Sequence, residues 1–231
     1  MPSSENVISV EELFSGQIRH SLQLHDSNRC LRCREWRSPS VRERNHPQVR
    51  YQVLKLNVDT LKLIQLGHTL CDADGNLPHL GTNCRYAWEF NFSDFDRNWR
   101  EGISSLHFAD FMFSSGLVGN GGVHWVSFHG SYDFGYLVKI LTQSSLPELL
   151  TDFMELLTAL FGSSLFDVKY MGSKRKLNGG LERQAALLQV ELAAGNAHQD
   201  WLRQSSHLPN FLKMSQKFGR RLTTSLELYM G

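Results

Sequence analysis

The stretch 124–141, HWVSFHGSYDFGYLVKIL, decides the predicted fold. It opens with a short, apolar, β-prone run at 124–128, which is typical of a strand buried on both faces of a sheet. Ser131 then fits the N-cap of a helix. Apolar residues recur at the helical positions i, i+3, i+4 and i+7, namely Phe134, Leu137, Val138 and Leu141. The stretch therefore predicts a strand that turns directly into a helix.

Asp133 lies at this predicted strand-to-helix junction. Ligands of α/β sheets bind outside the carboxyl ends of the strands, so an acid at this place is well positioned to hold a cation or to touch a phosphate. The alternative is that Asp133 only stabilises the N-terminus of the helix through the helix dipole. Position alone leaves both interpretations open.

The bulk composition is that of a globular protein. A length of 231 residues suits one domain, 1–231, with a substantial core. Because 24 Lys and Arg face 23 Asp and Glu, the net charge excludes no class of partner. The chain has no apolar run of membrane-spanning length, and its first residues have neither a basic start nor an apolar signal core. We therefore expect a soluble, intracellular protein with no membrane partner.

The four cysteines, Cys30, Cys33, Cys71 and Cys84, are predicted to be reduced thiols, because the chain has no secretion signal. Four thiolates would suffice for a zinc site, and this alternative stays open. The spacing of Cys71 and Cys84 is not that of a zinc knuckle, which counts against it.

The segment 24–50 has neither strand nor helix periodicity, since its arginines are scattered among Cys, Ser, Pro and Trp. Read alone, it predicts an irregular, solvated segment. The alternative is a basic arm for RNA in which Trp36 offers a stacking surface.

The remaining pattern predicts an α/β domain whose mixed sheet is flanked by helices. Strands are expected at 61–70, 86–92, 124–128 and 166–171, the first two as a hairpin that includes a turn at 74–76. Helices are expected at 9–24, 106–114, 131–141, 148–161, about 181–194 and 211–218.

Many collinear phrases between residues 51 and 199 resemble the CCR-associated factor (Caf) ribonucleases, and most of all the plant members. The phrases are KLNVD (55–59), LIQLG (63–67), DGN (74–76), WEFNF (88–92), SGLV (115–118), WVSFH (125–129), YDFGYL (132–137), DVKYM (167–171) and GGL (179–181). The resemblance implies a ribonuclease-H-like fold of the DEDD exonuclease class. It further implies a poly(A)-specific 3′-exoribonuclease that releases 5′-AMP as the deadenylase subunit of the CCR-NOT complex in mRNA turnover.

The resemblance also implies partners, location and cofactors. The partners would be poly(A) RNA, the CCR-NOT scaffold and the CCR-type nuclease subunits, in nucleus and cytoplasm. The cofactors would be two divalent cations, Mg²⁺ or Mn²⁺, held by four acids: an Asp-x-Glu pair on the first strand, the Asp after the Trp-x-Ser-Phe-His strand, and an Asp five residues after a His that acts as general base. Clustered carboxylates suit such hard cations. By this resemblance Asp133 is a metal ligand and His198 is the general base.

The chain departs from the family where the other acids should stand. The spacing puts the Asp of the Asp-x-Glu pair at Arg29 or Cys30, its Glu at Leu31 or Arg32, and the last Asp at Arg203. Asp200 follows His198 by two residues rather than five, so on a helix it would face another direction. The segments 24–50 and 200–210 match the family poorly, and a central strand built from 28–34 would have to bury several arginines.

These departures lead to the expectation of impaired activity. Three of the four acids are missing and arginines stand in two of their places, so cation binding would be opposed. The alternatives are a catalytically silent paralogue that binds RNA or the complex, and a pseudogene product. Scrambling at preserved spacing is what a shifted and later restored reading frame produces.

Overall fold

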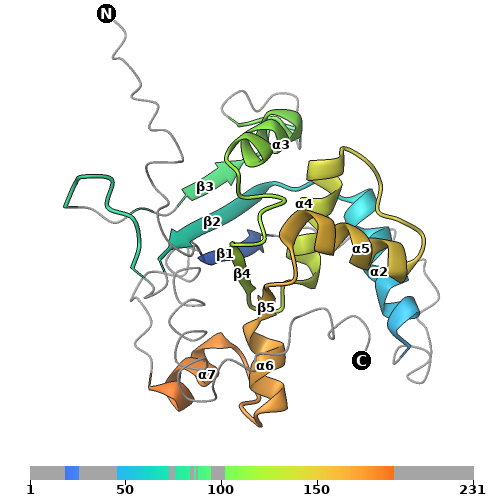
Figure 1. Ribbon diagram of the computed structural model, residues 1–231. Coiled ribbons are helices and arrows are strands. Elements are labelled where there is room, and N and C mark those ends of the chain that lie inside the picture. The colour runs from blue at the N-terminus through green and yellow to red at the C-terminus, as the bar shows by residue number, and fades with distance from the viewer. Residues whose placement is uncertain are drawn as a thin grey trace, which may run out of the picture.

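The structure is a computed structural model of the chain that describes residues 19–25, 46–72, 76–83, 86, 88–94 and 102–189 (Figure 1). Several predictions lie outside these ranges, among them most of the turn at 74–76, the part of the first helix before residue 19, and the helix at 211–218.

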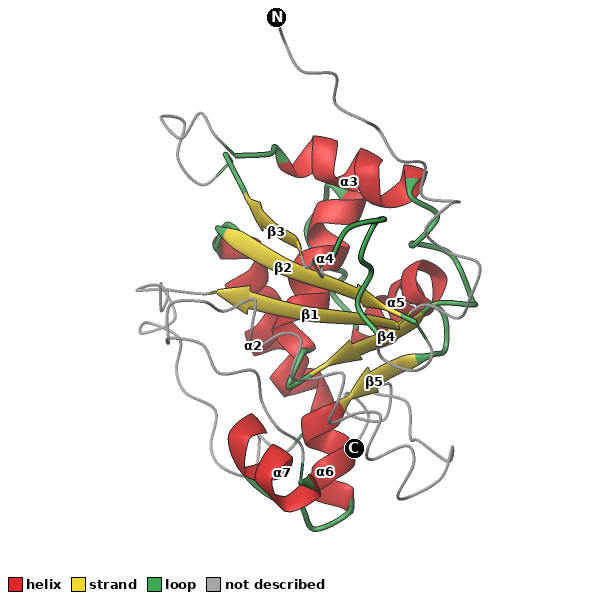
Figure 2. Ribbon diagram, turned by 90° about the vertical axis from the view of Figure 1, so that its left-hand side faces the viewer, coloured by secondary structure: helices red, strands yellow, loops and turns green. Residues whose placement is uncertain are grey.

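A mixed sheet of five strands lies at the centre of the described residues, with helices α2 to α5 beside it (Figures 1 and 2). The strands are β1 Arg19–His25, β2 Gln65–Cys71, β3 Trp88–Asn91, β4 His124–Ser127 and β5 Leu165–Asp167, in the spatial order β3-β2-β1-β4-β5. β2 pairs antiparallel with β1 and β3, whereas β4 pairs parallel with β1 and β5. The predicted mixed sheet and the antiparallel pairing of β2 with β3 are therefore confirmed.

The central strand is β1, which corrects two expectations. The helix predicted at 9–24 is wrong from residue 19 onward, and the strand expected at 28–34 lies instead at Arg19–His25. The reason is pairing on both sides, since β1 runs along the whole of β2 and along β4, and such tertiary contacts override a weak local pattern. The sequence of β1, RHSLQLH, has an arginine only at its first position, so the expected burial of several arginines does not fall on this strand.

The helices are α2 Pro47–Thr60, α3 Ser105–Ser114, α4 Ser131–Thr142, α5 Leu150–Phe161, α6 Val168–Lys174 and α7 Leu181–Leu188. Helices α3, α4 and α5 confirm three of the predicted helices to within the usual uncertainty at helix ends. Helix α7 ends earlier than predicted, because Gln189 takes a left-handed conformation with φ 56°. Within the described ranges, no helix combines the length and the apolar character needed to cross a membrane.

The prediction of an irregular segment at 24–50 is wrong at both of its described ends. Residues 24 and 25 belong to β1, and 47–50 are the first turn of α2. Pro47 fits the start of that helix, where the missing N–H has no intrahelical partner to lose. Residues 26–45 lie outside the described part of the chain, as do 200–210.

The buried strand predicted at 166–171 is confirmed at residues 166 and 167 and is wrong from residue 168 onward. β5 ends at Asp167, and α6 begins at the next residue. Tyr170 N donates to Asp167 Oδ1 at 2.9 Å, so Asp167 is the N-cap of α6. An apolar run of this length suits a strand or a buried helix equally well, and the cap decides between them here.

β4 is buried on both faces of the sheet, because its successive side chains point to opposite faces. Trp125 belongs to the larger core cluster, together with residues of α2 to α5, whereas Val126 packs in a second cluster with Val168 and Met171 of α6. Cys71 lies in the second cluster as a buried, reduced thiol. The other three cysteines lie outside the described residues, so the zinc alternative is not tested.

One face of α2 holds the linker that joins α4 to α5. Asp59 accepts the backbone N–H of Leu146 at 2.9 Å and pairs with Lys55 at 2.7 Å, and Lys55 also donates to the Leu146 carbonyl. Tyr51 donates to the carbonyl of Pro147 at 2.7 Å, and burial followed by the charge of Asp59 raises its pKa. These contacts fix α4 and α5 against α2.

Candidate functional site

The candidate site is the turn from β4 into α4. Gly130 rather than the predicted Ser131 is the N-cap residue, and Ser131 is the first residue of the helix. Asp133 lies in the first helical turn and is 8% exposed. The sequence prediction that this acid follows the strand closely and starts the helix is therefore confirmed.

Gly130 makes this tight turn possible. A Cβ at this position would lie 2.3 Å from Ser127 Oγ, 2.4 Å from Ser127 Cβ and 3.2 Å from Asp133 Oδ2. The backbone thus passes directly over the buried end of β4, where only a hydrogen fits. This close passage keeps the carboxylate of Asp133 next to the strand end.

A second acid, Asp167, joins this turn to the next one. Its Oδ2 accepts the backbone N–H of Gly130 at 2.8 Å, while its Oδ1 accepts that of Tyr170. Asp167 is 2% exposed, and it pairs with Ser127 in the register of β4 and β5. The turns that follow the two parallel strands are therefore held together by one buried carboxylate.

His129 stands on the exposed side of the same turn, with a left-handed φ of 64°. Histidine tolerates this conformation better than most residues. Partial burial lowers the pKa of His129, the charge of Lys169 lowers it further, and the charge of Asp167 acts in the opposite direction. Since its ordinary pKa is about 6.5, the ring is neutral at physiological pH.

The described residues do not fit a pair of divalent cations. Mg²⁺ and Mn²⁺ need several oxygen ligands, but no group of three or more His, Cys, Asp or Glu within the described ranges could hold a metal ion. The two oxygens of Asp167 already accept backbone N–H groups. Asp133 is thus left as a single predicted ligand whose metal-binding role stays a prediction.

The other predicted site residues lie outside the described part of the chain. They are His198, the predicted general base, and the positions where the resemblance places acids, Arg29, Leu31 and Arg203. The central strand carries neither Asp nor Glu in its sequence, although the resemblance puts two acids on it.

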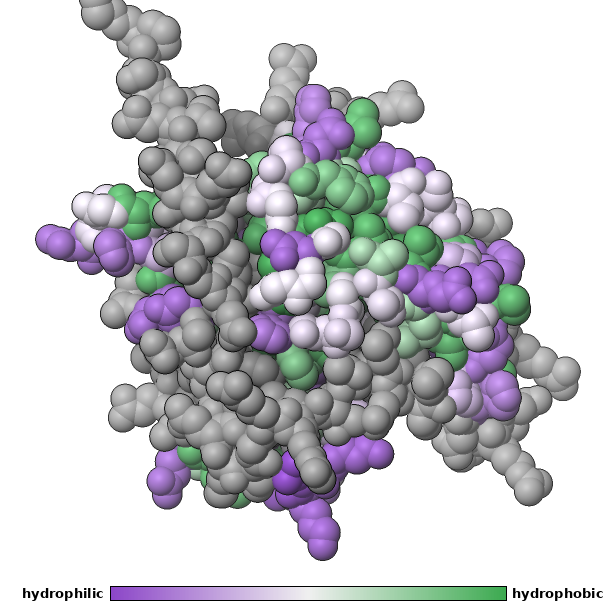
Figure 3. Space-filling view, in the orientation of Figure 1, coloured by the Kyte–Doolittle hydropathy of each residue, from purple (hydrophilic) through white to green (hydrophobic). Residues whose placement is uncertain are grey.

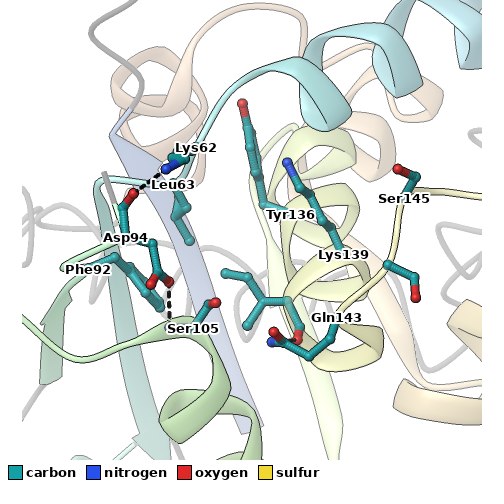
Figure 4. A pocket seen from close by; sticks show the side chains of 11 residues that line it. Lys62, Leu63, Phe92, Asp94, Ser105, Tyr136, Lys139, Gln143 and Ser145 are labelled. Carbon is teal, nitrogen blue, oxygen red and sulfur yellow. Dashed lines mark hydrogen bonds between the residues drawn. The ribbon is translucent and has the colours of Figure 1, made fainter. Parts of the chain in front are cut away.

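A separate pocket of about 360 Å³ lies between α4 and the loops before β2 and α3 (Figure 4). Its charged groups support the fold, because Lys139 Nζ donates to the carbonyls of Val58, Asp59 and Leu61 at 2.7 to 3.2 Å. Lys62 Nζ donates to the Asp94 carbonyl at 2.6 Å. Asp133 does not line this pocket.

Comparison with known proteins gives several relatives, although no family model matches the chain. A protein of Arabidopsis thaliana, probable CCR4-associated factor 1 homolog 7, is 38% identical over 212 residues, which cover 81% of this chain and 75% of that protein. Homolog 10 of the same plant is 39% identical and is covered to 72%. The poly(A) ribonuclease pop2 of Schizosaccharomyces pombe is 36% identical over 64% of this chain and 49% of its own length.

Solved structures show the same fold. The Mg²⁺- and Mn²⁺-bound form of S. pombe Pop2p superimposes with a TM-score of 0.72 at 28% identity, over 87% of this chain and 83% of that one. Yeast CAF1, co-crystallised with the MIF4G domain of NOT1, gives a TM-score of 0.69 at 22% identity, over 94% and 88% of the two chains. The fold is therefore the ribonuclease-H-like fold of the DEDD exonucleases, as predicted.

Within that class, the chain belongs to the CCR4-associated factor 1 family. The family predicted from the sequence phrases is thereby confirmed.

Sequence reasoning missed three features of the site: the need for a glycine at the N-cap position 130, the conformation of His129 and the role of Asp167. Asp is a favoured N-cap residue, so Asp167 was the one signal in the sequence that a helix could begin at residue 168. The bond from Gly130 to Asp167 joins residues 37 apart, and no local pattern announces such a contact.

Proposed function

We propose that this chain is a CCR4-NOT-associated subunit, directed to poly(A) RNA, whose own 3′-exoribonuclease activity is impaired. The family supplies poly(A) ribonucleases, as the name of the S. pombe relative states. The impairment and the assembly are inferred for this chain. The proposed location, nucleus and cytoplasm, follows from the same assembly.

The observation that carries the impairment is the sequence of the central strand. The resemblance places an Asp-x-Glu pair on the first strand, beside Asp133, and Mg²⁺ and Mn²⁺ are bound in the S. pombe structure. In this chain β1 reads RHSLQLH, and the strand position expected from spacing carries Arg29 and Leu31. Basic or apolar groups in place of carboxylates disfavour a doubly charged cation.

The test is a poly(A) degradation assay with Mg²⁺ or Mn²⁺, in which S. pombe pop2 serves as the active comparator. We expect adenylate release by this chain to be slower by about 10³-fold or more, because two-metal catalysis contributes several kcal/mol. Asp133→Ala should leave the residual rate unchanged. Metal-dependent release near the comparator's rate, abolished in Asp133→Ala, would show an active deadenylase and refute the impairment.

Docking on the scaffold is supported by an apolar surface on α3. Leu106 and Phe113 lie seven residues apart, on one face of the helix, and are 55% and 50% exposed. We call these two residues the α3 patch. Hydrophobic atoms come to the surface in the region of α3 in Figure 3. Large exposed apolar groups gathered on one element mark an interaction surface. The occupant we propose is a MIF4G-type scaffold domain, since the yeast neighbour was crystallised with one.

A pull-down with the MIF4G domain of the NOT1 scaffold tests this docking. Phe113→Arg should reduce capture by about tenfold or more, because it puts a charge into an apolar contact. Leu149→Arg is the matched control, since Leu149 is equally exposed but lies at the start of α5. Equal capture of both variants and of the unchanged chain would refute the assignment of the α3 patch. Absence of capture for the unchanged chain would favour the pseudogene alternative.

A further inference from the structure

The pocket beside α4 has a preformed apolar wall. The side chains that form this wall are 3 to 7% exposed, and they are Leu63, Phe92, Tyr136 and Ile140. The ring of Phe92 is fixed by an edge contact with Phe108, at a centroid distance of 5.3 Å. The volume of about 360 Å³ is that of a small-molecule site, and aromatic groups on the wall favour a ligand with a ring.

Polar groups at the rim of this pocket have hydrogen-bonding capacity to spare. Lys62 is exposed, and within the described part of the chain its ammonium group makes one hydrogen bond, to the Asp94 carbonyl, although it has three N–H groups. Over the same ranges the hydroxyls of Ser105 and Ser145 make no hydrogen bond. Figure 4 shows Lys62 and Ser145 on opposite sides of the pocket. A ligand can therefore receive hydrogen bonds from either side.

The charges that line the pocket leave one positive charge in excess, since two ammonium groups, of Lys62 and Lys139, face one carboxylate, that of Asp94. Asp94 Oδ2 accepts the backbone N–H of Ser105 at 2.6 Å, so this carboxylate is turned to the start of α3 (Figure 4). Burial lowers the pKa of Lys139, the charge of Asp59 raises it, and the charge of Lys62 lowers it again. An anion in the pocket would relieve this repulsion between the two ammonium groups.

We propose that this pocket binds a small aromatic anion, in which a carboxylate or phosphate group is attached to a single ring. The anionic group accepts hydrogen bonds from Lys62 and a serine hydroxyl, and the ring lies on the apolar wall. Lys139 acts as a fixed charge, because its Nζ already donates to three carbonyls. Asp133 does not line the pocket, so this inference does not rest on the proposed function.

A set of simple probes, titrated into the full chain, tests each part of the ligand. Benzoate and phenyl phosphate have both a ring and an anionic group, benzamide has the ring without the charge, and inorganic phosphate has the charge without the ring. We expect benzamide and inorganic phosphate to bind at least about tenfold more weakly than the better of the other two, because each lacks one set of contacts. The tighter of benzoate and phenyl phosphate identifies the anionic group.

Methyl NMR spectra locate the bound ring and give its Kd. Because Ile140 belongs to the apolar wall, the ring current of a bound probe should shift its δ1-methyl resonance. Ile140→Val lacks this methyl group and therefore assigns the resonance.

Substitutions of Lys62 test the cationic contact. Lys62→Met removes the charge and should weaken benzoate binding by about tenfold, whereas Lys62→Arg should restore most of the affinity. Lys174→Met is the matched control, since Lys174 is exposed at the end of α6 and does not line the pocket. It should leave the affinity unchanged.

Any of three results would overturn the site: benzoate and phenyl phosphate both leave the Ile140 resonance in place, benzamide binds as tightly as they do, or Lys62→Met binds them like the unchanged chain. The poly(A) degradation assay and the capture by the MIF4G domain are independent of these measurements. Failure of the pocket therefore leaves the proposed function standing.

Discussion

At the scale of single residues, Gly130 shows how one missing side chain shapes the candidate site. Any Cβ there would overlap Ser127, which belongs to a fully buried strand end. Because the obstacle is close to the backbone, it cannot be relieved by a rotamer change alone. The position of Asp133 thus depends on a residue that has no side chain.

We therefore expect Gly130→Ala to lower the free energy of unfolding by about 2 kcal/mol, the usual cost of overpacking. Gly121→Ala is the control, because a Cβ at Gly121 would meet nothing within 4 Å and should change stability by less than about 0.5 kcal/mol. Urea denaturation measures both. Equal effects of the two substitutions would show that the contact with Ser127 does not limit the turn.

His68 makes stability depend on pH. It is 3% exposed in β2, its ring centroid lies 6.4 Å from that of Trp125, and burial lowers its pKa from 6.5 to about 4. Between pH 4 and pH 6.5, His68 therefore binds a proton in the unfolded chain but not in the folded chain. The corresponding stability is fully present above pH 6.5 and is lost as the pH falls from about 6.5 through 4, to a total of about 3 kcal/mol.

His68→Leu should remove this part of the acid dependence. Unfolding free energies measured by urea at neutral pH and near pH 4.5 should differ less in the variant than in the unchanged chain, by about 2 to 3 kcal/mol. His107→Leu is the control, since His107 lies exposed on α3. An unchanged acid dependence in His68→Leu would mean that other groups cause it.

At the scale of elements, the linker between α4 and α5 depends on α2. Asp59 holds the Leu146 N–H and the Lys55 ammonium at once, and both contacts are largely screened from solvent. Glu148 also reaches Lys55, at 3.3 Å, but its side chain is 80% exposed. The two acids therefore make the same kind of contact in very different surroundings.

Asp59→Ala should lower the free energy of unfolding by about 2 kcal/mol, because it leaves a backbone N–H and a partly buried ammonium group without their acceptor. Glu148→Ala, the matched control, should cost less than about 0.5 kcal/mol, as exposed ion pairs do. Thermal or urea unfolding compares the two. A similar loss in both would indicate that the linker is held by its apolar contacts instead.

The elements that the sequence predicted correctly are those with an unambiguous period. Helices α4 and α5 and strand β4 have apolar residues at regular spacing and turn residues at their ends, so local pattern and tertiary structure agree. The predictions for the segments that form β1 and α6 were wrong for different reasons. β1 is defined by its partners on both sides rather than by its own pattern, and α6 by a single cap from Asp167.

At the scale of the whole molecule, the fold of the family is present, and the loss of its chemistry is what we propose. The sequence phrases between 51 and 199 sufficed to predict the family and the α/β sheet, because they encode the packing of the core. The site could be predicted only at Asp133. The turn that carries Asp133 is held by the hydrogen bond from Gly130 N to Asp167. Asp167 is far from this turn in the sequence and is brought to it by the pairing of β5 with β4.

The proposed loss of the cation site predicts how the protein responds to metal ions. A ligand present at about 100 times its Kd stabilises a protein by about 2.7 kcal/mol, which would raise Tm by several degrees in a chain of this size. We expect millimolar Mg²⁺ or Mn²⁺ to change Tm by less than about 1 °C relative to EDTA, whereas S. pombe pop2 should be stabilised. A rise of several degrees that disappears in Asp133→Ala would reveal a functional cation site.

The place of β1 in the sheet also bears on synthesis at the ribosome. β1 is made first, and its antiparallel neighbour β2 emerges about 45 residues later, but the parallel partner β4 follows only after about 100 residues. Until then the nascent chain exposes an unsatisfied row of peptide groups along the future middle of the sheet, where a chaperone or another strand could attach. Translation beyond residue 127 is thus the step that closes this edge.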